Sequence, residues 1–163
     1  MLQDSITKDK LFIDASEVLS PLDLQVVDVR KSEYGATLGI SVIIRAQSHE
    51  VTVADCAKAY RILFPRWSLE ETKRDLELEV STPGIQRTLR DYYEFSLFVG
   101  RRCRVYDSAK SAWVEGIIKT DSDRCVTLSK AHIDDSKDLI EEYVIPYEQI
   151  QKAKLAYAWE DVL

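Results

Sequence analysis

The sequence predicts an α+β protein with an N-terminal α/β domain, in the order α-β-β-α-β, followed by a small C-terminal β-barrel. Up to residue 91, segments with apolar residues at helical spacing alternate with segments in which every second residue is apolar. Beyond Gly100, five short strand-like segments recur within about 60 residues, separated by polar turns. The 163 residues suffice for one ordinary domain or two small ones, and 45% apolar content excludes general disorder. We therefore expect domains at residues 1–91 and 92–163, with the boundary near Tyr92.

The first domain is expected to open with a helix and a hairpin. Apolar residues at helical spacing predict a helix over Ser5–Leu19. Alternating apolar residues then predict strands over Leu24–Arg30 and Leu38–Ile44. Because Lys31–Gly35 reads as a turn between them, the two strands should form a hairpin.

A second amphipathic helix and a third strand complete this domain. Thr52 and Asp55 have the spacing of a capping box, and the apolar stripe that follows is expected to end at Pro65. The apolar face of this helix should cover the hairpin. The alternation in Leu76–Val80 predicts the third strand.

The second domain is expected to follow a short helix. Asp91 and Glu94 form a cap-like pair before an apolar segment that stops at Gly100. Pro146–Ile150 leaves room for only one tight turn between the last two strands, as in small SH3-like and Sm-like barrels. The expected strands are Arg102–Tyr106, Trp113–Thr120, Cys125–Leu128, Glu142–Ile145 and Ile150–Leu155.

The stretch Leu78–Leu89, with the sequence LEVSTPGIQRTL, is the strongest candidate for a binding site. Its strand should end at Ser81, after which Thr82 can cap a short helix with Pro83 at the first position. A helix start leaves backbone N–H groups unpaired, and Gly84 permits close approach, so an anion or a carbonyl-rich partner could dock there. The alternative is a plain Pro-Gly type II turn with surface arginines.

Charge along the chain supports a localised anionic partner. In the expected short helix, Ile85 and Leu89 share one buried face while Arg87 and Arg90 project elsewhere. Residues 86–104 contain five arginines against two acids, three net positive charges in a chain of net charge −6. The negative net charge of the whole chain argues against a general nucleic-acid coat protein. The local excess indicates contact with one anionic surface, with a solvated charged face as the alternative.

Metal and disulfide chemistry are not expected. Cys56, Cys103 and Cys125 are odd in number and widely spaced, which favours reduced, buried thiols over a disulfide or a zinc site. His49 and His132 are the only imidazoles. The acidic segment AHIDDSKD lacks the EF-hand pattern and its glycine, so we expect an exposed loop there. No metal or other cofactor is therefore expected.

Catalysis and membrane insertion are not expected either. Ser81 or Thr82 as a nucleophile would need a base, and neither histidine lies in a recognisable catalytic context. No apolar run approaches the roughly 20 residues that span a bilayer, and acids occupy the N-terminal segment where a signal peptide is apolar. We expect a non-enzymatic, cytoplasmic protein.

The order and spacing of several motifs resemble the RimP family of bacterial ribosome maturation factors, over about Leu11 to Leu155. The strongest motif is LEVSTPGIQRTL, similar to the family's leucine-glutamate-valine-serine-serine-proline-glycine stretch followed by arginine and leucine. Thr82 replaces the second serine and Gln86 replaces an aspartate of that pattern. Supporting matches are Val26–Arg30, Val51–Cys56, Gly100–Arg104 and Ile145–Leu155.

The resemblance implies an N-terminal α/β domain, a C-terminal Sm-like barrel and a non-catalytic role in maturation of the small (30S) ribosomal subunit. The implied partners are the free 30S subunit or its precursor, with 16S rRNA and small-subunit ribosomal protein twelve as contacts. Replacing Arg87 with glutamate is expected to weaken this association and leave folding intact. The expected contact residues are Ser81, Thr82, Pro83, Gly84 and Arg87, with electrostatic support from Arg90, Arg101, Arg102 and Lys154.

The alternative function is that of an Sm-like RNA-binding protein acting as an oligomeric RNA chaperone, because such barrels assemble edge to edge. Readers of single-stranded RNA place aromatic residues among basic ones, whereas Trp113 is expected to be buried by a barrel strand. We therefore expect a monomer. Trp159, in the C-terminal tail, is expected to pack on the barrel.

Overall fold

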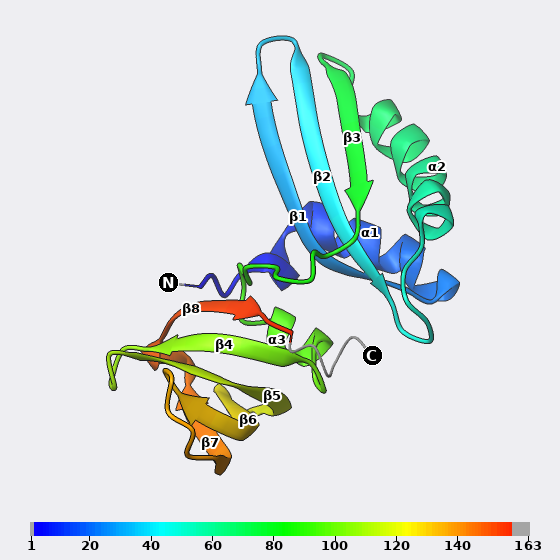
Figure 1. The fold of residues 1–163 in the computed structure, drawn as a ribbon. Helices are drawn as coiled ribbons and strands as arrows, with labels where there is room; N and C mark the ends of the chain where they lie inside the picture. Colours follow the sequence, from blue (N-terminus) through cyan, green and yellow to red (C-terminus); the bar gives the residue numbers. More distant parts are fainter. Residues whose placement is uncertain (1, 158–163) are drawn as a thin grey trace. The chain divides into compact units, whose positions relative to one another are not determined.

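The structure is a computed structural model that describes residues 2–157, and the chain forms two compact units (Figure 1). The first unit is Ser5–Pro83, and the second contains residues 2–4 and the chain from Gly84 onward. The expected boundary near Tyr92 differs from this division. Residues 84–91 lie in the second unit because Leu89 N–H donates to the carbonyl of Ala153 at 2.8 Å in the last strand.

The first helix, α1, spans Lys10–Leu19 and follows a single 3₁₀ turn, η1, at Ile6–Lys8. Asp9 caps α1, since its carboxylate accepts from the backbone N–H of Leu11 at 2.9 Å and of Phe12 at 3.1 Å. Because Asp9 is the N-cap, α1 begins after it and is separate from the preceding 3₁₀ turn. The expected continuous helix from Ser5 was therefore too long at its N-terminal end. A second 3₁₀ turn, η2, follows at Ser20–Leu22.

The sheet of the first unit contains β1 (Leu24–Tyr34), β2 (Thr37–Ala46) and β3 (Asp75–Ser81), in the order β1-β2-β3. β1 and β2 form the expected antiparallel hairpin, and Gly35 supplies the positive φ of 61° that its tight turn requires. β3 is parallel to β2. The apolar residues that alternate along β2 are buried, as predicted: Leu38, Ile40, Val42 and Ile44.

The second helix, α2, spans Val53–Glu70 and packs chiefly against β3, while α1 packs against β1 (Figure 1). The capping box between Thr52 and Asp55 is confirmed. The prediction that Pro65 ends the helix was wrong. The helix continues for another turn because Trp67 is buried, and its indole N–H donates to Asp14 of α1 at 2.8 Å. The pyrrolidine ring lies on the exposed side, where a lost backbone hydrogen bond is tolerated best.

The second unit is an antiparallel sheet of five strands in the order β7-β6-β5-β4-β8, preceded by the short helix α3 at Glu94–Leu97. β8 returns beside β4, the first strand, which gives the predicted small Sm-like barrel. The 3₁₀ turn η3 (Tyr147–Gln149) provides the expected tight connection. The strands are β4 (Arg102–Asp107), β5 (Ala112–Ser122), β6 (Cys125–Ile133), β7 (Ile140–Pro146) and β8 (Ile150–Leu155).

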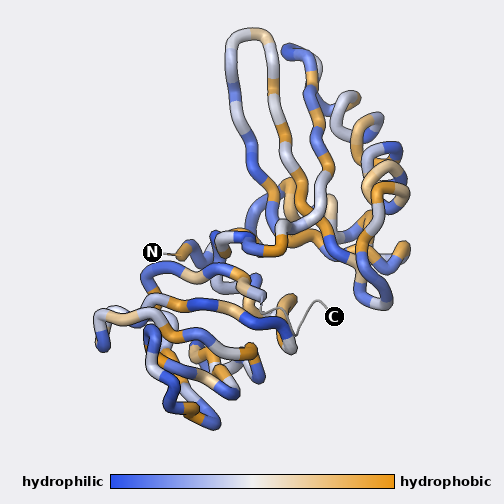
Figure 2. Tube along the Cα trace, viewed as in Figure 1, coloured by the Kyte–Doolittle hydropathy of each residue, from blue (hydrophilic) through white to orange (hydrophobic). Residues whose placement is uncertain are grey.

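Alternating burial along these strands builds the barrel core, and hydrophobic and hydrophilic residues alternate visibly along them in Figure 2. β5 bends through two irregularities in its pairing with β6. Gly116 lies within the first of them, and a Cβ added there would stand 2.9 Å from the carbonyl oxygen of Ser129. A side chain there would push β6 away from β5.

Two further expectations concern the acidic segment and the C-terminal tail. The acidic segment beginning at Ala131 was expected to be a loop throughout, but β6 extends to Ile133 and the exposed loop is residues 134–139. Trp159 lies outside the described residues. Within residues 2–157, no helix is long and apolar enough to cross a membrane.

Candidate functional site

The candidate site begins at the corner Ser81–Gly84, where the chain leaves β3. Ser81 is the last residue of β3 and pairs with Ile43 of β2. Thr82 and Gly84 are exposed, and Pro83 is half-buried. Two hydroxyl groups and an accessible backbone are therefore presented at this corner.

The short helix expected after Pro83 is absent. The backbone N–H of Arg87 donates to the carbonyl of Gly84 at 3.1 Å, which closes a turn. The chain then runs extended beside β8, with Leu89 N–H bonded to Ala153 and Leu155 N–H bonded to the carbonyl of Arg87, both at 2.8 Å. Pairing with an existing strand satisfies these groups, whereas a helix of a few residues would leave most of its terminal groups unpaired. Leu89 is buried as predicted, but Ile85 is 59% exposed.

Gly84 also does not form the alternative type II turn. That turn requires a positive φ at its glycine, and the positive-φ glycines of the described chain are Gly35 and Gly100. A Cβ added at Gly84 would meet nothing within 4 Å. The corner therefore offers neither a helix N-terminus nor a left-handed glycine, and any binding there must use its exposed hydroxyls and backbone.

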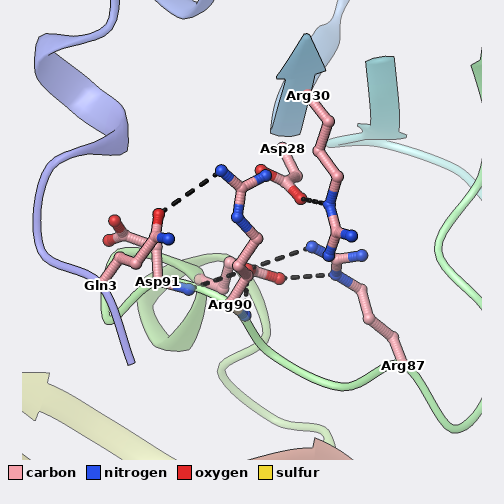
Figure 3. Close-up of polar contacts among 7 residues, drawn as sticks. Gln3, Asp28, Arg30, Arg87, Arg90 and Asp91 are labelled. Atoms are coloured by element: carbon pink, nitrogen blue, oxygen red, sulfur yellow. Dashed lines mark hydrogen bonds and ion pairs between the residues drawn. The ribbon is translucent and has the colours of Figure 1, made fainter. Parts of the chain in front are cut away.

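Arg87 is held inside the second unit by a buried ion pair with Glu94. Its Nε donates to one carboxylate oxygen at 2.6 Å and its Nη2 to the other at 3.1 Å (Figure 3). The Arg87 side chain is 7% exposed and that of Glu94 is fully buried. Glu94 further accepts from the backbone N–H of Arg90 at 2.8 Å and of Asp91 at 3.2 Å. The arginine therefore orders residues 87–94, and its charge does not face solvent as the sequence suggested.

Arg90 is also engaged within this unit. Its guanidinium lies 3.4 Å from the side-chain oxygen of Gln3 (Figure 3). Gln3 pairs with the same segment through its backbone, donating to the carbonyl of Arg90 at 2.8 Å and accepting from Tyr92 at 3.0 Å. The N-terminal residues 2–4 thus belong to the barrel unit because they add a short bridge to it.

The remaining predicted residues lie on or beside the barrel strands. Arg101 is exposed and stacks loosely over Phe98, with its guanidinium carbon 6.0 Å from the ring centre. Arg102, on β4, is half-buried and lies 3.8 Å from a carboxylate oxygen of Glu115 on β5. Lys154 lies on β8, directly opposite Arg104 of the neighbouring strand β4.

The structure brings Arg102 and Lys154 onto a larger patch that sequence reasoning missed, which we call the basic face. It consists of the outward side chains of three neighbouring strands. These are Arg102, Arg104 and Tyr106 on β4, Trp113 and Glu115 on β5, and Lys152 and Lys154 on β8.

Trp113 was expected to be buried, and that was wrong. It points outward because the buried positions of β5 are its neighbours Ala112 and Val114. Its ring meets Tyr106 edge-on at 5.5 Å and lies under the guanidinium of Arg104 at 5.2 Å. The alternation of polar and apolar residues along β4 could have revealed this face, but it does not show which strands become neighbours.

The thiols and the tyrosine of β7 serve the fold. Burial raises the pKa of the Cys103 thiol to about 12, and burial also raises the pKa of Cys56. All three cysteines are free, but Cys103 alone is fully buried, whereas Cys56 and Cys125, which were also expected to be buried, are half-buried. Burial, reinforced by its hydrogen bond to Asp107 at 2.8 Å, raises the pKa of Tyr143 to about 12. No cluster of three or more metal-ligating side chains occurs among residues 2–157.

A serine, a histidine and an aspartate do meet in the first unit, away from Ser81 and Thr82 in the sequence. The hydroxyl of Ser48 lies 3.3 Å from Nδ1 of His49, whose Nε2 lies 2.8 Å from Asp55. Asp55 is already the carboxylate of the α2 capping box, and the Ser48 hydroxyl donates to Asp23. These contacts tie the exposed loop between β2 and α2 to both of its ends, which is a structural role.

Comparison with known proteins gives a match to a family model and similarity to solved structures, among them two Sm-like archaeal proteins. The family model of the RimP N-terminal domain matches residues 15–86. An Sm-like archaeal protein from Pyrobaculum aerophilum is similar at 16% identity and a TM-score of 0.37, over 41% of this chain and 52% of that one. An SmAP (LSm) protein from Methanococcus vannielii is similar at 19% identity and a TM-score of 0.36, over 40% of this chain and 94% of that one. The similarity thus spans about half the length of the first of these proteins.

Proposed function

We propose that the chain belongs to the RimP family of ribosome maturation factors, whose N-terminal domain model it matches, and that it is a non-catalytic assembly factor of the small (30S) ribosomal subunit. It acts in the cytoplasm on free or immature subunits. The observation that carries this proposal is the match of residues 15–86 to the RimP N-terminal domain. The proposed contacts are 16S rRNA and small-subunit ribosomal protein twelve.

The arrangement of charge supports binding to a defined part of the subunit. The chain as a whole carries −6, yet four basic side chains lie together on the adjacent barrel strands β4 and β8. An acidic body resists nonspecific attachment to nucleic acid, while a local basic face favours one orientation of approach. We propose that Arg101, Arg102 and Lys154 contact the subunit directly.

The corner residues contribute in a different way. Ser81, Thr82, Pro83 and Gly84 are proposed to contact the subunit through hydroxyl and backbone groups. Arg87 and Arg90 are proposed to support binding by holding residues 87–94 in place, since Arg87 is paired with the buried Glu94.

Sedimentation of the tagged protein from cell extract across a salt series tests this function. We expect the protein in fractions containing free small subunits or their precursors, with release as salt rises because the contacts are partly ionic. The double variant Arg101→Glu, Lys154→Glu should reduce this association, and Lys137→Glu, in the loop between β6 and β7, serves as the control. Absence of the unaltered protein from all ribosomal fractions at low salt would refute the proposal.

The alternative of an oligomeric ring is disfavoured by the edge of β8. Edge-to-edge assembly needs a strand with unpaired backbone groups. Here residues 87–89 of the same chain occupy that edge through the bonds of Leu89 and Leu155. A second barrel would have to displace them.

A further inference from the structure

We propose that the basic face binds single-stranded RNA, with a base stacked at Tyr106 and Trp113 and the neighbouring phosphates held by Arg104, Lys152 and Lys154. The inference rests on the proposed function, because it names RNA as the component of the subunit that this face contacts. It adds a binding site on β4, β5 and β8 that the candidate residues at the corner do not include.

The first argument is the shape of the aromatic pair. Tyr106 and Trp113 meet at 74°, so their rings form two walls at an angle instead of one flat stack. Beside them lies an open groove of about 430 Å³. Ligand pockets begin at roughly 300 Å³, so one base with its sugar fits this volume. The groove is lined by Tyr106, Ser108, Trp113, Glu148, Gln151 and Lys152.

The second argument is the arginine on the indole ring. The guanidinium of Arg104 lies 5.2 Å from the Trp113 ring centre, which orients a planar cation beside the groove. Single-stranded nucleic acids are bound by aromatic rings interleaved with cations, because every base has a face to stack and every nucleotide carries a phosphate. Arg104 and Trp113 together supply both kinds of contact.

The third argument is the charge that remains after internal pairing. Glu115 is shared among Arg102 at 3.8 Å, Arg104 at 3.6 Å and His132 at 3.3 Å. The Glu115 carboxylate is therefore shared and does not serve Arg104 alone. Within residues 2–157, neither Lys152 nor Lys154 forms an ion pair, so their two charges add to the excess. Phosphates attract such an excess on an otherwise acidic chain.

The polar groups of the groove favour RNA over an acidic peptide. Ser108 and Gln151 line it together with the aromatic pair, and hydroxyl and amide groups can both donate to and accept from base edges. A carboxylate-rich peptide would need cations on all sides, whereas Glu148 closes one side of the groove. An uncharged base beside Glu148, with phosphates toward the lysines, satisfies both features.

Fluorescence anisotropy with labelled ten-residue oligouridine tests the proposal, using the full chain and a duplex RNA of equal length as comparison. Trp113→Ala should weaken oligouridine binding about tenfold or more, and Trp113→Phe should restore most of it, because a stacked base is worth that much. Lys152→Glu should weaken binding and lower the salt slope by about 1. Lys137→Glu, which makes the same charge change outside the basic face, should leave the affinity within about twofold.

The outcomes separate this inference from the proposed function. No binding of oligouridine by the unaltered chain, equal or tighter binding of the duplex, or equal losses in Lys152→Glu and Lys137→Glu would each overturn it. Loss of subunit association in Trp113→Ala without any oligouridine binding would assign the face to a ribosomal protein and overturn it as well. Oligouridine binding that depends on Trp113, in a protein absent from ribosomal fractions, would support the RNA site and refute the assembly role.

Discussion

At the scale of single residues, Arg87 shows how burial changes the meaning of a motif. In the sequence it is a basic residue beside a Pro-Gly turn, suited to an anionic partner. In the structure its guanidinium and the Glu94 carboxylate neutralise each other where solvent is nearly excluded. Such a pair adds little to stability as a whole, but removing one partner leaves a buried charge. Its main effect is to specify the path of residues 87–94.

Arg87→Glu is therefore expected to impair folding, in contrast to the expectation from sequence. Two buried carboxylates would face each other, and breaking a buried ion pair costs about 3–5 kcal/mol of unfolding free energy. Urea unfolding at neutral pH measures this loss. Arg101→Glu makes the same charge change at an exposed position and should shift the unfolding free energy by about 0.5 kcal/mol or less. Equal stability of the two variants would show that the pair does not order this segment.

At the scale of elements, one carboxylate joins the two helices of the first unit. Asp14 of α1 accepts from Arg66 at 2.6 Å and from the Trp67 indole at 2.8 Å, both on the last turns of α2. These bonds lie just beyond Pro65 and hold the part of α2 that the proline would otherwise release. The helix thus continues past the proline where contacts with α1 hold its last turns in place.

Acid is expected to weaken this anchor. The hydrogen bond from Arg66, with that from Trp67, holds the pKa of Asp14 below its usual range, against the opposing effect of burial. A carboxyl whose pKa is lower in the folded state stabilises the fold above its unfolded pKa of about 3.9 and loses that contribution as pH falls through the folded pKa. The unfolding free energy should therefore fall between about pH 5 and pH 2.

Asp14→Asn provides the measurement, because it removes the titrating group and keeps an oxygen that can accept a hydrogen bond. The variant should be less stable than the unaltered chain at pH 7, and the gap should narrow as the pH falls below 4. Chemical unfolding followed by circular dichroism across this range reports both quantities. A gap that stays constant with pH would show that Asp14 does not contribute through its charge.

At the scale of the whole molecule, an acidic chain with one basic face and an occupied β8 edge is suited to act as a single copy. Residues 87–89 cover the edge of β8 at residues 153–155, where their backbone groups pair with those of the strand and leave less of that edge free for a second barrel. The basic faces of two copies would also repel each other. Charge repulsion and strand pairing thus both favour a monomer.

Light scattering coupled to size exclusion should give the mass of one 18.7 kDa chain at both low and high salt. Leu89→Pro removes the N–H that donates to Ala153, and is expected to expose the β8 edge and increase association. Leu89→Ile keeps the donor and the apolar side chain and serves as its control. A ring-sized mass for the unaltered chain would favour the oligomeric alternative.

Much of the fold was accessible from sequence because its signals are local. The alternation of Leu38, Ile40, Val42 and Ile44 identifies a half-buried strand wherever the chain folds, and the capping box at Thr52 identifies a helix start. The five barrel strands follow from the same period of two. The α+β class and its order of elements were therefore predicted correctly.

The candidate site depended on contacts between residues far apart in the chain, which local periodicity does not contain. Residues 87–89 form an extended segment instead of a helix because they pair with the edge of β8, which lies more than 60 residues later in the chain. The pairing of Trp113 with Tyr106 and Arg104 required β4 and β5 to lie in one register. Sequence alone determined the order and type of the main elements and that the third strand ends in a Pro-Gly corner, because backbone periodicity is local. Only the tertiary structure decided that Arg87 is enclosed and that Trp113 is half-buried on the outer face of the barrel, because burial is a property of neighbours in space.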